Sequence, residues 1–198
     1  YSLLDGACTV KGLAQLAKEN DMNAMAITDH GYMGGVEEFH RVLSGEGINP
    51  IVGVEAYVAP GDRRDFDSNK PFNRGGFHLI LLSENETGYL NLYKMMSLAN
   101  RSGFHYKPRI DRELLREYNA GLICPTACIG SEISQYYLQG DEKRAEQALK
   151  QYLDIFGPDR FFIELMDHGI DEERRCNKFL IGQARRNNLK LIATNDVH

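Results

Sequence analysis

The sequence predicts an α/β fold, either a (βα) barrel or an open doubly wound sheet. Short apolar runs alternate with longer amphipathic segments, which is typical of parallel strands joined by helices. Three of the apolar runs, in residues 24–30, 161–168 and 191–198, break off into aspartate and histidine. An open sheet gathers its ligand at one switch point, whereas a barrel collects polar groups from the ends of many strands. Candidate polar groups follow five different runs, so the sequence favours the barrel.

The periodicity predicts six helices and six strands. The first helix has Leu13, Leu16 and Ala17 at helical spacing behind Thr9, a residue type that caps helices. The helices are expected at residues 10–20, 35–43, 87–100, 111–118, 141–156 and 171–188, and the strands at residues 24–28, 51–58, 77–82, 121–125, 161–165 and 189–194. Residues 60–76 are polar, rich in glycine and aspartate, and without periodicity, so we expect a mobile surface loop there.

Length and composition indicate one globular domain. The chain has 198 residues, of which 42% are hydrophobic and 26% charged, and we expect residues 1–198 to form a single domain. No apolar stretch approaches the roughly 20 residues of a membrane span, and the start lacks the pattern of a signal peptide. We therefore expect a cytoplasmic protein without membrane contact. Because the sequence starts at Tyr1 and stops at His198, directly after a ligand-like pair, we expect a segment truncated at both ends.

Charge and cysteine content narrow the function classes. A net charge of -5 argues against a surface devoted to nucleic-acid phosphates, although Lys107, Pro108 and Arg109 offer one small basic edge. The four cysteines form no C-x-x-C pair, so neither a zinc ribbon nor a disulfide framework is indicated.

The aspartate and histidine endings indicate divalent metal binding. Histidine nitrogens and carboxylate oxygens around a cavity can hold two or three ions, which activate a shared water and clamp a phosphoryl group. Glu55 lies inside an apolar strand, and a buried carboxylate requires a cation, an arginine or solvent. The sequence has no G-x-S-x-G elbow, P-loop or G-x-G-x-x-G motif. The glycines of residues 31–35 fit either a flexible turn or a phosphate-binding helix start, and the turn is the simpler interpretation.

Three histidines stand apart from this pattern. His78 begins its predicted strand, a position more typical of a core histidine than of a ligand. His40 and His105 are expected on a solvated helix face and in a loop, and we exclude both from the site.

Nine stretches, which together span the chain, resemble the polymerase and histidinol phosphatase (PHP) domains of bacterial DNA polymerase III alpha subunits. They are residues 1–6, 27–31, 50–60, 78–82, 87–92, 107–111, 127–133, 164–169 and 193–198. The resemblance implies a distorted (βα)7 TIM-like barrel with up to three divalent ions at its mouth: zinc, manganese or iron, with magnesium as an alternative. The His-x-His pair that opens such domains would precede Tyr1, so a first strand and two ligands are expected to be missing.

The resemblance also assigns ligands. The metal ligands it implies are Asp5, His30, Glu55, His78, Cys128, Asp196 and His198; the catalytic residues among them are Asp5, His30, Glu55 and Asp196. This assignment overrides the core interpretation of His78 and promotes Cys128, whose thiolate suits zinc. Asp29 is expected to support His30. Asp167 and His168 are expected to be neighbours of the site rather than ligands.

Three functions follow from this resemblance. The first is a metal-dependent phosphoesterase or 3'-5' exonuclease module within a replicative DNA polymerase, a nucleotidyltransferase. Its expected partners are DNA through the parent protein, the remaining polymerase domains, a proofreading exonuclease subunit and the sliding clamp. The second is a structural module that metal staples together and that docks the proofreading subunit. The third is a free-standing phosphoesterase similar to histidinol phosphatase.

Overall fold

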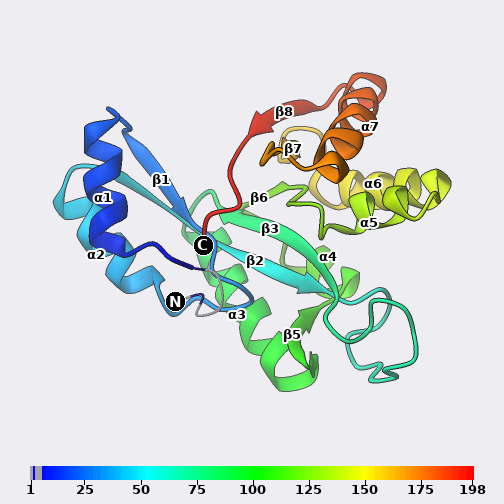
Figure 1. The fold of residues 1–198 in the computed structure, drawn as a ribbon. Helices are drawn as coiled ribbons and strands as arrows, with labels where there is room; N and C mark the ends of the chain where they lie inside the picture. Colours follow the sequence, from blue (N-terminus) through cyan, green and yellow to red (C-terminus); the bar gives the residue numbers. More distant parts are fainter. Residues whose placement is uncertain (1, 3–5) are drawn as a thin grey trace.

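The chain folds into one curled sheet with helices packed against it (Figure 1). The computed structural model describes residues 2 and 6–198, and within them it contains eight strands and seven helices. The strands are β1 (Ala24–Ile27), β2 (Asn49–Val58), β3 (Phe77–Ser83), β4 (Phe104–His105), β5 (Lys107–Ile110), β6 (Leu122–Pro125), β7 (Phe161–Leu165) and β8 (Lys190–Ala193). The helices are α1 (Val10–Glu19), α2 (Val36–Gly45), α3 (Glu86–Ser102), α4 (Arg112–Tyr118), α5 (Glu132–Leu138), α6 (Glu142–Phe156) and α7 (Asp171–Asn187).

The long strand β2 organises the sheet. One edge of β2 pairs with β3, and the other pairs with β1 along its first half and with β5 near its end. Beyond β3 the order continues through β6, β7 and β8. In the part of the chain that the structure describes, no pairing joins β1 to β8, so the sheet follows part of a barrel wall and stays open there. The α/β, barrel-type fold class predicted from the sequence is thus confirmed.

Strand direction corrects one expectation. The strands β1, β2, β5, β6, β7 and β8 run the same way, as expected, but β3 is antiparallel to both of its neighbours. The beginning of β3 therefore lies at the same edge of the sheet as the carboxyl ends of β1, β6, β7 and β8. We call this edge, which carries His30, Glu55, His78, Cys128, Asp196 and His198, the C-terminal rim.

All six predicted helices are present, and capping explains most of their starts. The caps of α1, α3, α4, α5 and α6 each accept a hydrogen bond from a backbone N–H in the first turn; they are Thr9, Asn85, Asp111, Ser131 and Asp141. Sequence analysis missed α5, a helix of 7 residues, and the short strands β4 and β5. None of the described helices is both long and apolar enough to cross a lipid bilayer.

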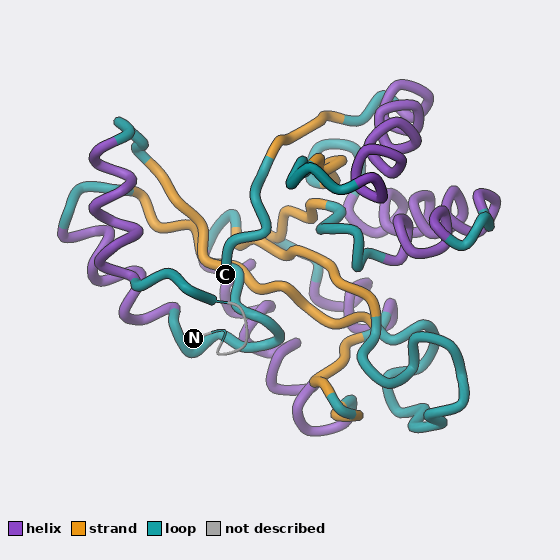
Figure 2. Tube along the Cα trace, in the orientation of Figure 1, coloured by secondary structure: helices purple, strands orange, loops and turns teal. Residues whose placement is uncertain are grey.

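The helices pack in groups against the sheet. Figure 2 shows α1 and α2 beside β1, and α5, α6 and α7 together at the opposite end of the sheet, near β7 and β8. The main core lies between the sheet and α3–α7, and a smaller core joins α1 and α2 through Ala17, Phe39 and Leu43. Both cores bury apolar side chains, which is the dominant favourable contribution to folding.

The long segment 60–76 is irregular but is tied down by Arg109. The Arg109 side chain is fully buried and donates hydrogen bonds to the carbonyl oxygens of Arg63 (2.8 Å), Asn73 (2.6 Å) and Gly103 (3.1 Å). The segment is an irregular surface loop, as predicted, and its contacts with Arg109 hold it against the domain. The prediction of a small basic edge at residues 107–109 is wrong for Arg109, because its guanidinium is buried inside the protein.

The buried guanidinium predicts a large effect of substitution. Arg109→Met should lower the free energy of unfolding by about 3 kcal/mol or more, because it leaves several buried carbonyl oxygens without a donor. Urea unfolding measures the loss. The matched control is Arg64→Met on the same loop, whose side chain is 52% exposed and pairs with Asp62, and which should change stability little. Equal midpoints for wild type and Arg109→Met would contradict this role.

Candidate metal centre

The C-terminal rim brings together six of the seven predicted ligands. His30 follows β1, Cys128 follows β6 and His198 follows β8, whereas Glu55 lies within β2 and His78 near the start of β3. The sixth, Asp196, lies with its Oδ1 3.5 Å from His198 Nε2. Asp5, the seventh, lies outside the described residues.

Glu55 is the centre of the cluster. Its side chain is fully buried, and its two oxygens face two different groups of donors. Oε2 contacts His30 Nδ1 and lies 3.9 Å from His198 Nε2. Oε1 lies 2.8 Å from His78 Nδ1 and 3.8 Å from Cys128 Sγ. In each group the donor atoms lie within 4.8 Å of one another, so the carboxylate is shared between two potential metal sites.

Backbone pairing fixes His30 against Glu55. The Gly31 N–H donates to the Glu55 carbonyl (2.8 Å), and the Glu55 N–H donates to the Asp29 carbonyl (3.1 Å). These bonds extend the parallel register of β1 and β2, which ends at Ile27 and Val52, by three residues to a bridge between His30 and Glu55. Neighbouring strands lie about 5 Å apart, which brings the two side chains into contact.

A glycine makes room for His78. The His78 N–H donates to the Gly130 carbonyl (3.0 Å), which places the turn after Cys128 against the start of β3. A Cβ atom on Gly130 would lie 2.8 Å from His78 Nδ1, closer than such atoms approach. Any side chain at residue 130 would therefore displace the imidazole from its position 3.5 Å from Cys128 Sγ.

The cluster shifts the pKa values of its members. Burial alone would raise the pKa of Glu55, but hydrogen bonds and charge from His30 and His78 lower it to about 2. Burial alone would lower the pKa of His198, but Asp196, the Thr28 carbonyl and Glu55 raise it to about 9. Burial, helped by the negative charges of Asp196 and Glu55, raises the pKa of Cys128 to about 12. Burial and the two carboxylates thus disfavour the Cys128 thiolate, and a divalent ion held beside it would offset both effects.

The donor set fits a divalent metal. His198 Nε2 is buried and has no hydrogen-bond partner among the described residues, although it points at two carboxylates. Its other nitrogen, Nδ1, is bonded to the Thr28 carbonyl at 2.9 Å, the arrangement that orients metal-binding imidazoles. Imidazole, thiolate and carboxylate together suit zinc or iron better than magnesium, which prefers oxygen.

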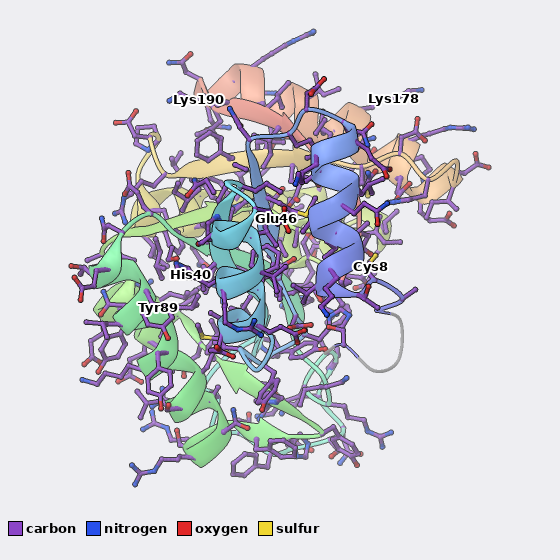
Figure 3. All side chains as sticks on the ribbon, turned by 90° about the vertical axis from the view of Figure 1, so that its left-hand side faces the viewer. Cys8, His40, Glu46, Tyr89, Lys178 and Lys190 are labelled. Atoms are coloured by element: carbon purple, nitrogen blue, oxygen red, sulfur yellow. The ribbon has the colours of Figure 1, made fainter. Side chains whose placement is uncertain are left out.

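The residues outside the two donor groups agree with the sequence predictions only in part. The Asp29 carboxylate is buried, belongs to neither donor group and accepts a hydrogen bond from Ser2 (2.8 Å). His168 pairs with Glu173 at 2.7 Å and belongs to neither donor group. His40 lies on α2, as Figure 3 shows. His105 is not in a loop as expected but in β4, where its ring bonds to Ser68 (2.9 Å).

Sequence reasoning missed Glu164 as part of this site. Glu164 lies in β7, is 5% exposed, and bonds to both Ala127 and Thr194. The signal that could have found it is the one that revealed Glu55, a carboxylate inside an apolar strand.

The chain is similar to known proteins along its whole length. Residues 1–168 match the model of the PHP domain family. The chain is 46% identical to the DNA polymerase III subunit alpha of Treponema pallidum, and 46% identical to that of Thermus aquaticus. Both alignments cover 100% of this chain but only 17% and 16% of the relatives. The chain therefore spans about one sixth of their length.

Two solved structures share the fold. One is an amidohydrolase from Chromobacterium violaceum with bound sulfate and no metal, with a TM-score of 0.59 and 16% identity. The alignment covers 100% of this chain and 85% of that one. The other, from Bifidobacterium adolescentis, is named as a candidate metal-dependent phosphoesterase, with a TM-score of 0.58 and 13% identity. That alignment covers 98% of this chain and 84% of the Bifidobacterium adolescentis protein.

The geometry predicts that Cys128 determines zinc content. Cys128→Ser should lower zinc affinity by about 10-fold or more, since a hydroxyl is a poorer zinc ligand than a thiolate. The metal content of protein equilibrated with buffered zinc, measured by elemental mass spectrometry, tests this. Cys8→Ser is the matched control, because Cys8 is exposed near the start of α1 (Figure 3). If both variants retain as much zinc as the wild type, Cys128 is not a ligand.

Proposed function

The chain belongs to the PHP domain family, and from that premise we propose that residues 1–198 form the PHP domain of a bacterial DNA polymerase III alpha subunit. We further propose that its C-terminal rim binds a multinuclear metal centre with phosphoesterase or 3'-5' exonuclease chemistry. The identity of 46% along the whole chain supports the first part. The parent protein would then be a nucleotidyltransferase that works on DNA in the cytoplasm.

The observation that carries the chemistry is the shared carboxylate of Glu55. Two donor groups meet at its two oxygens, which is the arrangement that holds paired ions in phosphoesterases. When bound, divalent ions at such a pair activate a water molecule and offset charge on the phosphoryl oxygens. His30, His198 and Asp196 would hold one side of the site, and His78 with Cys128 the other. Asp5 stays a predicted ligand.

The proposed partners follow from the relatives. DNA and the remaining polymerase domains would contact this domain within the parent protein. A proofreading exonuclease subunit and the sliding clamp are further proposed partners. A free-standing phosphatase is the least supported of the three functions, because the whole-length similarity is to polymerase subunits.

One observation favours the structural module as a second candidate. The His30 and His198 rings lie 3.9 Å apart, although they follow β1 and β8, between which the described sheet has no pairing. Metal held by both residues would join the two sides of the open sheet. In that case the ion stabilises the domain without catalysing hydrolysis.

The exonuclease proposal predicts a specific loss of activity. In the full-length protein, Glu55→Gln and Asp196→Ala should each lower metal-dependent release of 3' nucleotides by about 100-fold or more, because each removes a ligand. Release from a 3'-labelled oligonucleotide, measured with and without chelator, reports this activity. Polymerisation by the same preparations should be unchanged.

A matched pair of histidines sharpens the test. His30→Ala should abolish nucleotide release, whereas His40→Ala, on α2 and outside both donor groups, should retain it. Release that survives in both Glu55→Gln and Asp196→Ala would rule out exonuclease chemistry at this rim. If chelation lowers the melting temperature while the wild type releases no nucleotide, the structural module is the correct function.

A further inference from the structure

We propose that Glu164 is a positioning residue that holds the Cys128 turn and the Asp196–His198 segment in one geometry around the metal centre. The inference rests on the proposed metal centre and assigns Glu164 a role toward it. Glu164 lies in β7, between β6 and β8, whose following segments carry these ligands. It links two segments of the site, the Cys128 turn and residues 194–198, which are at least 66 residues apart in sequence.

On one side Glu164 holds the turn that carries Cys128. Its Oε2 accepts a hydrogen bond from the Ala127 N–H at 2.8 Å, and its own N–H donates to Thr126 Oγ1 at 2.9 Å. Ala127 has a φ of +67°, a left-handed conformation that residues other than glycine adopt reluctantly. A charge-assisted hydrogen bond to its N–H stabilises this conformation, which directs the next residue, Cys128, into the site.

On the other side Glu164 holds the segment that carries Asp196 and His198. Its Oε1 accepts a hydrogen bond from Thr194 Oγ1 at 2.6 Å. The Thr194 N–H also donates to the Leu165 carbonyl at 3.1 Å, so Thr194 is fixed to β7 through both its backbone and its side chain. The chain leaves β8 at Ala193, and Thr194 therefore sets the direction in which the ligand segment departs.

Glu164 supports ligands rather than joining them. Each of its carboxylate oxygens already accepts a hydrogen bond, and it belongs to neither donor group. Burial raises its pKa, and the charges of Asp196 and Glu55 add to this, while Thr194 and Ala127 oppose it. A third carboxylate beside Glu55 and Asp196 is electrostatically unfavourable until cations offset the charge, which fits a role beside a metal centre.

Cobalt binding tests the inference, because a cobalt–thiolate bond absorbs in the near ultraviolet and so reports the position of Cys128. In the full-length protein, the absorption that Cys128→Ser removes identifies the signal from this site. Glu164→Gln and Thr194→Val should each raise the cobalt dissociation constant by about 10-fold or more and weaken that absorption. Thr194→Ser, which keeps the hydroxyl, should restore wild-type binding.

Glu132→Gln is the matched control for a buried glutamate. Glu132 is 4% exposed and follows the Cys128 turn, but among the described residues its carboxylate bonds to α6 and α4, through Tyr152 Oη at 2.8 Å and Arg112, and to neither ligand segment. This variant should keep the cobalt spectrum of the wild type even if it unfolds more easily. A weakened spectrum in Glu132→Gln to the same degree would mean that general destabilisation explains the effect, and would overturn the inference.

The outcomes separate this inference from the proposed function. A wild-type protein without any Cys128-dependent cobalt signal would overturn the metal centre and the role of Glu164 together. A normal wild-type signal that persists with unchanged affinity in Glu164→Gln and Thr194→Val would overturn only the role of Glu164. If circular dichroism shows that Glu164→Gln is unfolded, the comparison of Thr194→Val with Thr194→Ser decides alone.

Discussion

The fully buried carboxylate of Glu55 is the constraint on which the rest of the site depends. A buried charge is tolerated only where opposite charge and hydrogen bonds compensate for the lost water. His30 and His78 provide that compensation and lower the pKa of Glu55 to about 2, against the effect of burial. Because these groups come from β1 and β3, on opposite edges of β2, the compensation requires three strands to meet in one register.

The reversed direction of β3 completes the ligand set. In a fully parallel sheet, a histidine at the beginning of a strand would lie at the edge opposite the carboxyl ends. The antiparallel pairing of β3 with β2 and β6 puts His78 at the C-terminal rim instead, beside the turn that carries Cys128. One strand of inverted direction thus supplies His78, one of the three members of the second donor group, and Gly130 provides the space that its imidazole needs.

The site could be predicted from the sequence where local pattern determines position. His30, Asp196 and His198 follow apolar runs, and parallel strands bring such ends together, so their convergence was predictable. Glu55 was predictable as a polar residue in an apolar strand. The location of His78 was not, because the direction of β3 depends on partners distant in sequence. The same holds for Arg109, a basic residue that looks exposed until residues 63–73 surround it with carbonyl oxygens.

The open side of the sheet gives metal binding a consequence beyond chemistry. His198 reaches across from the end of β8 to bond the Thr28 carbonyl at the end of β1, and its ring lies against that of His30. Ligands so far apart in sequence come together only in the folded chain, so the free energy of metal binding adds to the free energy of folding. A metal centre would therefore stabilise the domain whether or not it also catalyses hydrolysis. A hydrolytic centre at this rim would also hold the two sides of the sheet together, and only the presence or absence of hydrolysis distinguishes the two.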